Sequence, residues 1–177
     1  MAESINRRHF LAGGAATLGF YLIGGRLTHA SAAEATAIGF TPRILNNAQV
    51  SALETIADAL VPGAKAQGIA AYIDSQLAEG DSSKLIAKYL GVGTPGQKGF
   101  YSAALDAALK QTELTEAPDA FTRALATDAV KDWQGPPGSY FTFVLRADAL
   151  DVVYGTPQGF DAIGVPYMAH IQPEAIW

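Results

Sequence analysis

Apolar residues in the middle of the chain recur at the three- and four-residue steps of an amphipathic helix. The clearest case is the segment 46–61, whose apolar positions are Val50, Leu53, Ile56, Ala57 and Leu60. Asn46 and Gln49 stand at the spacing of a capping box, which marks the start of a helix. Pro62-Gly63 is a pair that ends helices. The pattern therefore predicts a helix from Asn46 to just before Pro62.

The same spacing predicts further short helices at about 69–77, 83–90, 97–111, 118–133 and 140–154. Breaks rich in glycine and proline separate these segments. No pair of segments alternates apolar and polar residues as two paired strands do. The sequence therefore predicts an all-α fold, in which five to six short helices make one helical domain over residues 46–154.

Residues 1–32 have the layout of a twin-arginine (Tat) export signal. Arg7 and Arg8 come shortly before Phe10 and Leu11, and no charged residue occurs from His9 to Gly25. Ala30-Ser31-Ala32 then gives the small-x-small pattern of a cleavage site. We therefore expect export to the periplasm through the Tat translocase, with residues 33–45 as a linker or arm.

An uncleaved signal that anchors the chain to a membrane is the alternative. A membrane-spanning helix needs about 20 strongly apolar residues, and the stretch from His9 to Gly25 is shorter and diluted by glycines. Tat export carries folded cargo, so a Tat signal implies folding or cofactor loading before export.

The last segment, residues 155–177, contains three prolines and three glycines and cannot form one continuous helix. It is also rich in aromatic and aliphatic side chains, which are scarce in disordered tails. We expect an extended, irregular tail that lies across its own domain or binds another protein. The candidates for a partner interface are Tyr154, Phe160, Tyr167, Met168, His170 and Trp177.

Composition removes several classes of protein. The absence of cysteine excludes disulfide scaffolds, iron–sulfur clusters, covalently attached haem and thiol nucleophiles. Charged residues make up only 16% of the chain and the net charge is −5. This acidic balance argues against a nucleic-acid partner, which would require a basic patch.

Candidate chemistry is sparse. His170 is the one histidine outside the export segment, and no nucleotide-binding or zinc-binding motif occurs. Asp148 and Asp151 share a face of the predicted helix 140–154, where the simplest interpretation is a solvated face or an ion pair. The alternative is a stand-alone periplasmic enzyme or sugar-binding module that uses Asp148, Asp151 and His170. We expect no catalytic, cofactor or metal site in this chain.

Several segments, in order along the chain, resemble the gluconate 2-dehydrogenase subunit 3 family. They are Arg7-Arg8-His9-Phe10-Leu11, residues 53–63, residues 70–74, the stretch from Phe141 through Asp148, residues 154–160 and Gly164-Val165-Pro166-Tyr167. The amino-acid sequences of the last two segments are most similar to those of the glucoside 3-dehydrogenase branch.

The resemblance implies a small subunit of a periplasmic, FAD-dependent sugar dehydrogenase. Such a subunit has no cofactor of its own, because the FAD belongs to a large flavoprotein of the glucose–methanol–choline type. The small subunit stabilises the flavoprotein and carries it through the Tat pathway on its own signal. Electrons then pass to a c-type cytochrome subunit or another acceptor.

Overall fold

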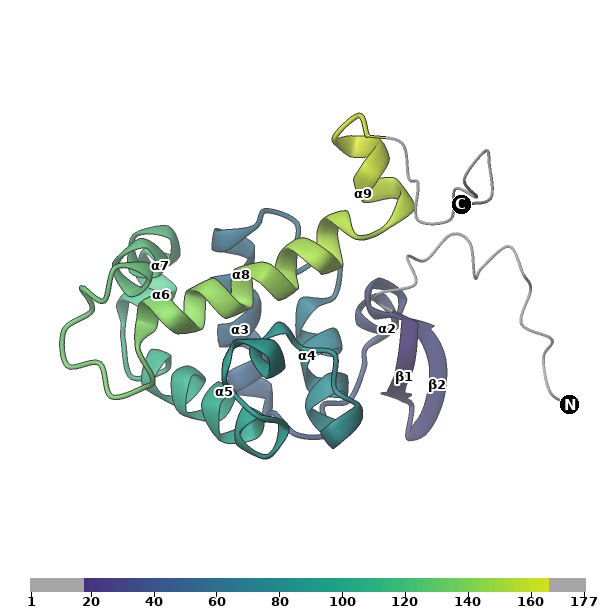
Figure 1. Cartoon of the computed structure of the whole chain (residues 1–177), viewed down its shortest axis with the longest axis horizontal. Coiled ribbons are helices and arrows are strands. Elements are labelled where there is room, and N and C mark those ends of the chain that lie inside the picture. Colours follow the sequence, from purple (N-terminus) through teal and green to yellow (C-terminus); the bar gives the residue numbers. More distant parts are fainter. Residues whose placement is uncertain (1–17, 166–177) are drawn as a thin grey trace, which may run out of the picture.

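Helices make up most of residues 18–165, the part of the chain that the computed structural model describes (Figure 1). The α-helices of this part are α2 (Ala32–Ile38), α3 (Asn47–Leu60), α4 (Ile69–Ala78), α5 (Thr94–Ala108), α6 (Glu113–Glu116), α7 (Pro118–Ala126), α8 (Gly138–Tyr154) and α9 (Pro157–Ala162). Two short 3-10 helices follow α4, η1 (Gly80–Ser82) and η2 (Ile86–Leu90), and only η2 falls within the predicted helix 83–90. A two-stranded antiparallel sheet consists of β1 (Leu18–Ile23) and β2 (Arg26–Ser31). The mostly helical fold is confirmed, although the expectation of an all-α fold is not exact because of this short sheet.

The predicted capping box sets the start of α3. The Asn46 side chain accepts a hydrogen bond from the Gln49 N–H, and the Gln49 side chain accepts one from the Asn46 N–H, both at 2.9 Å. The Gln49 amide also donates to Asp106 of α5 at 2.9 Å. The cap therefore fixes the start of α3 and joins it to a neighbouring helix.

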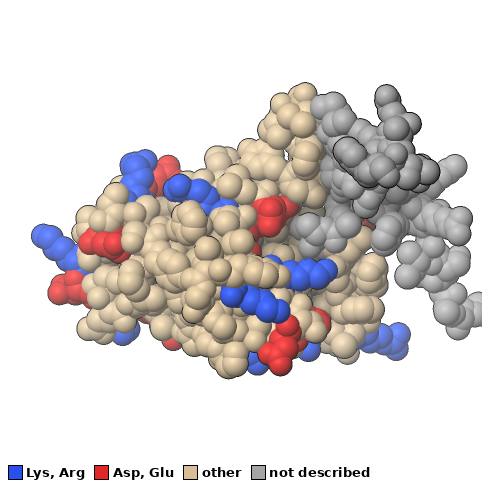
Figure 2. Space-filling model, in the orientation of Figure 1, with Lys and Arg blue, Asp and Glu red and all other residues tan. Residues whose placement is uncertain are grey.

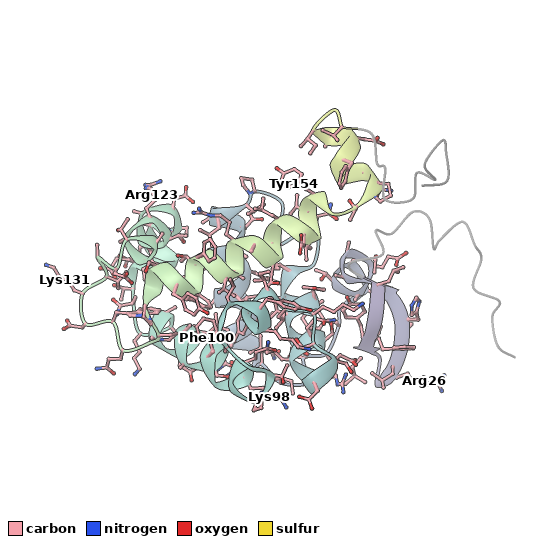
Figure 3. The ribbon with its side chains drawn as sticks, viewed as in Figure 1. Arg26, Lys98, Phe100, Arg123, Lys131 and Tyr154 are labelled. Carbon is pink, nitrogen blue, oxygen red and sulfur yellow. The ribbon has the colours of Figure 1, made fainter. Side chains whose placement is uncertain are left out.

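Helix α8 crosses the molecule in front of α3 and packs against α3, α4, α5 and α7 (Figure 1). Tyr101 of α5 and Phe141 of α8 are fully buried, and their rings meet edge to face with centroids 6.1 Å apart. Phe100 extends this cluster to Tyr140, with ring centroids 5.6 Å apart (Figure 3). Such edge-to-face pairs stabilise a fold by more than the burial of their apolar area alone would.

Residues 18–31, which the sequence places in the export signal, form a β-hairpin. Its strands pair in register from Leu18 opposite Ser31 to Ile23 opposite Arg26. Gly24 and Gly25 both have positive φ, as a two-residue type I′ hairpin turn requires. The hairpin was missed because a short apolar run that contains glycines fits a signal sequence as well as a strand.

The segment 33–45, expected to be a linker, instead contains most of α2. Ser31 caps this helix, and the Glu34 carboxylate accepts a hydrogen bond from the Ser31 N–H at 2.8 Å. After α2 the backbone N–H groups of residues 43–45 all donate to the buried carboxylate of Asp74 on α4. The segment is therefore fixed to the domain at both ends.

The expectation of an irregular tail over residues 155–177 is wrong for its first part. Thr156 caps α9, which extends beyond the end of α8 and away from the other helices (Figure 1). Of the predicted interface candidates, Tyr167, Met168, His170 and Trp177 lie outside the described residues, as do Arg7, Arg8, Phe10 and Leu11 of the expected export signal.

Candidate functional site

The side of α8 that faces away from the core carries a stripe of apolar residues, flanked by the exposed Arg146 and Asp151. Phe143 is 57% exposed and Leu150 is 43% exposed, although both side chains are large and apolar. Ala147 and Tyr154 are half-buried. These four residues, spaced by four, three and four positions, share one side of the helix, and we call them the outer face of α8.

The opposite side of α8 is packed into the core, as the sequence predicted. Its buried residues include Phe141, Val144, Leu145, Ala149 and Val152. Helix α8 therefore carries apolar side chains on both sides, which is typical of a helix that is covered all round. Within the described residues, the outer face is covered only in part, because Phe143 and Leu150 remain exposed.

The apolar surface continues onto α9. Phe160 is half-buried, and Ile163 and Val165 after it are exposed. Tyr154 marks the point where α8 passes into α9 (Figure 3). Figure 2 shows that uncharged residues cover most of the face of the molecule turned toward the viewer. Exposed apolar side chains that gather in one region, such as those of α8 and α9, are typical of sites of protein interaction.

Positive charges are spread around the described part of the chain. Arg26 of β2, Lys98 of α5, Arg123 of α7 and Lys131 of the loop before α8 point outward (Figure 3). Figure 2 likewise shows Lys and Arg side chains interspersed with Asp and Glu side chains. On the face shown, charges of both signs are therefore mixed.

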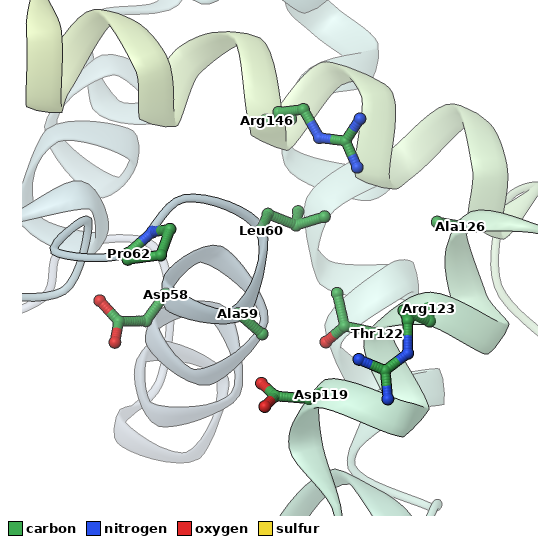
Figure 4. A pocket seen from close by; sticks show the side chains of 9 residues that line it. All are labelled: Asp58, Ala59, Leu60, Pro62, Asp119, Thr122, Arg123, Ala126 and Arg146. Carbon is green, nitrogen blue, oxygen red and sulfur yellow. The ribbon is translucent and has the colours of Figure 1, made fainter. Parts of the chain in front are cut away.

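An open hollow of about 310 Å³ lies between the end of α3, α7 and α8 (Figure 4). Arg146 reaches into it from α8, and Asp119 and Arg123 line it from α7. Asp58, on a third side, accepts hydrogen bonds from the N–H groups of Gly63 and Lys65, both at 3.1 Å. Side chains of opposite charge thus share a small, solvent-open hollow.

Asp148 is buried between α8, α5 and η2 rather than on the solvated face that the sequence suggested. Its carboxylate accepts hydrogen bonds from the Ile86 N–H at 3.0 Å and from the Tyr101 hydroxyl at 2.9 Å. Asp151, one turn along, is exposed. The two carboxylates therefore do not form a pair open to a substrate, and Asp148 ties three elements together.

Burial raises the pKa of Asp148 to about 6, because an apolar environment disfavours the charged form. The two hydrogen bonds lower the pKa and the nearby Asp151 raises it, but both effects are smaller than that of burial. The neighbouring Tyr101 hydroxyl has a pKa well above its ordinary value, also chiefly because of burial.

We expect Asp148→Asn to change the pH dependence of stability. The folded chain holds the Asp148 proton more tightly than the unfolded chain, so the stability contributed by Asp148 is full below about pH 4 and is lost as the pH rises through about 6. The amide does not titrate. Relative to the wild type, the variant should therefore gain about 3 kcal/mol in free energy of unfolding between pH 4 and pH 7.

Urea denaturation of both proteins at pH 4, 5, 6 and 7 measures this difference. Asp161→Asn, at an exposed position on α9, is the matched control and should follow the wild type at every pH. A difference between Asp148→Asn and the wild type that stays constant with pH would contradict the account.

Among residues 18–165, no group of three or more histidine, aspartate or glutamate side chains is arranged to hold a metal ion. No helix in this part of the chain has both the length and the apolar character needed to cross a bilayer. Comparison with family models, with curated proteins and with solved structures finds no match to this chain.

Two of the predicted interface residues lie within the described part of the chain: Tyr154 is the last residue of α8, and Phe160 belongs to α9. Phe143 and Leu150 were not among the predicted candidates. Their signal was present in the sequence, because apolar residues occupy positions 143, 147, 150 and 154 in addition to those that face the core. A helix with apolar residues on both sides is an indication of a second covering layer.

Proposed function

We propose that this chain is a non-catalytic small subunit that binds and exports a large enzyme subunit. The observation that carries the proposal is the outer face of α8, where Phe143 and Leu150 leave a large apolar surface open to solvent. Exposing such a surface is unfavourable, at about 25 cal/mol for each Å² of apolar area. A partner protein that covers it removes this cost.

The identity of the partner rests on the resemblance to the gluconate 2-dehydrogenase subunit 3 family. It is a flavoprotein of the glucose–methanol–choline type, which holds FAD and oxidises a sugar or glycoside. A c-type cytochrome subunit is the proposed electron acceptor. The Arg7-Arg8 pair supplies the Tat signal for the assembly, which places it in the periplasm.

The burial of Asp148 supports this assignment over a stand-alone enzyme. A general acid or base must come within hydrogen-bonding distance of its substrate. Both oxygens of the Asp148 carboxylate are instead engaged by Ile86 and Tyr101 inside the domain. The Asp148 carboxylate therefore has a structural role. This role agrees with a chain that leaves the redox chemistry to its partner.

We expect lysine on the outer face of α8 to weaken the complex. Leu150→Lys and Phe143→Lys place a charge where the partner would bury an apolar side chain, and each should reduce the affinity roughly tenfold or more. Co-expression with the flavoprotein encoded beside this chain, followed by purification through a tag on this chain, measures the amount of flavoprotein retained.

Leu109→Lys is the matched control, since Leu109 at the end of α5 is 42% exposed and Leu150 is 43% exposed. The control should retain the flavoprotein like the wild type. The proposal fails if Leu150→Lys, Phe143→Lys and Leu109→Lys all retain equal amounts, or if the wild type retains none.

A further inference from the structure

The expected cleavage site of the export signal is buried in the folded domain. Ala30 is 7% exposed, Ser31 is 8% exposed and Ala32 is 0% exposed. Ser31 is the N-cap of α2 and Ala32 is its first residue, so the bond after Ala32 lies in the first turn of a capped helix. A peptidase needs an accessible segment around the bond that it cuts, and cleavage of a buried site requires local opening.

The hairpin before this site is hydrogen-bonded to residues that follow it. Strand β1 pairs with β2 on one edge. On the other edge, the Thr41 N–H donates to the Leu22 carbonyl at 2.7 Å, and Ile23 pairs with Phe40 in an antiparallel bridge. Strand β1 is therefore hydrogen-bonded on both edges. The segment of Phe40 and Thr41, which holds one edge, would remain in the chain after cleavage.

Side-chain packing fixes the same region. Tyr21 of β1 is buried, and this burial raises the pKa of its hydroxyl to about 12 despite a hydrogen bond with the Ser75 side chain on α4. Gly68, immediately before α4, lies directly against Ala32. A Cβ atom on Gly68 would lie only 2.2 Å from the Ala32 carbonyl oxygen.

We propose that the folded domain masks the Ala30-Ser31-Ala32 site from signal peptidase, so that the exported chain keeps the hairpin of residues 18–31. This inference rests on the proposed Tat export, in which the chain folds before it meets the peptidase. Cleavage after Ala32 would also remove Tyr21 and Ala30, which are both part of the hydrophobic core. The hairpin is thus a permanent part of the fold, made from residues that also belong to the export segment.

Purified full-length chain in detergent micelles, incubated with purified signal peptidase, provides the test. Intact-mass spectrometry should find the wild type uncut after Ala32. Gly68→Ala forces a Cβ against Ala32 and should be cut at this bond at least about a hundredfold faster, because it populates the open form. Gly63→Ala is the matched control, since Gly63 also has positive φ but has open space around its Cβ position, and it should resist like the wild type.

Tyr21→Ala is a second variant that weakens the packing of the hairpin. It removes a buried side chain of β1, and the chain should therefore also be cut after Ala32. Cutting of the wild type at the rate of Gly68→Ala would overturn the proposal. Resistance of both variants would also overturn it, because burial would then not be the source of the protection.

The chain recovered from the periplasm gives the corresponding result in cells. Its mass should include residues 18–31, and a chain that starts at Ala33 would overturn the masking proposal while supporting export. A chain found only in the cytoplasm would instead contradict the proposed function. The experiment with purified peptidase does not depend on export and still decides the masking proposal in that case.

Discussion

Asp74→Ala should lower the free energy of unfolding by about 3–5 kcal/mol, because it leaves three backbone N–H groups, one of them fully buried, without an acceptor. The Asp74 carboxylate accepts hydrogen bonds from the N–H groups of Arg43 at 2.8 Å, Ile44 at 2.9 Å and Leu45 at 2.8 Å. These bonds hold the segment between α2 and α3 against α4. A hydrogen bond to a charged group contributes about 1.5–3 kcal/mol.

Urea denaturation followed by far-ultraviolet circular dichroism measures this loss. Asp74→Asn keeps the oxygen that binds Ile44 and Leu45 but turns an NH₂ group toward the Arg43 N–H, so its loss should be intermediate. Asp81→Ala removes a single exposed hydrogen bond to Thr94 and should cost less than about 1 kcal/mol. An Asp74→Ala variant as stable as Asp81→Ala would contradict the account of how this segment is held.

Gly68→Ala should lower the free energy of unfolding by about 3 kcal/mol. Gly68 has a φ of +84°, which costs about 1–2 kcal/mol for a residue with a Cβ atom. The added Cβ would also overlap the backbone of Ala32, and overpacking of this kind costs about 1–3 kcal/mol. Relief of the overlap requires α2 and the hairpin to move away from α4.

Gly63→Ala separates the two contributions. Its φ of +93° imposes the same conformational cost, but no atom lies within 4 Å of the added Cβ. It should therefore cost about 1–2 kcal/mol, with the hairpin still in place. Thermal and urea denaturation of both variants measure the difference, and equal losses would show that the contact between Gly68 and Ala32 contributes nothing.

The helical part of the fold could be predicted because its determinants are local. The apolar spacing of α3 and its capping pair, Asn46 and Gln49, lie within one segment, and both were confirmed. The buried side of α8 followed from the same spacing. Local patterns of this kind need no knowledge of which segments meet in space.

The hairpin and the packing around Asp74 could not be predicted in this way. An apolar run with glycines, such as residues 18–25, fits both a signal sequence and a turn between strands, and only contacts with α4 distinguish them. The bonds of Asp74 join residues about 30 positions apart, with separations between 29 and 31. Asp148 looked like a surface charge because its partners Ile86 and Tyr101 are distant in sequence.

The candidate site was only partly visible in the sequence. Tyr154 and Phe160 were found because aromatic residues stand out in a segment rich in glycine and proline. Phe143 and Leu150 were not, because the spacing of apolar residues shows that a helix has two apolar sides but not which side the domain leaves uncovered. That distinction comes from the packing of α8 on α3 and α7.

The central claim is that this chain carries a flavoprotein through the Tat pathway, and replacing Arg7 and Arg8 together by lysine tests it most directly. The measurement is the amount of the co-expressed flavoprotein in the periplasmic fraction, with and without the replacement. The account predicts that the flavoprotein is periplasmic with the wild-type chain and stays in the cytoplasm, still bound to this chain, with the double variant. Equal amounts of periplasmic flavoprotein in both cases would contradict it.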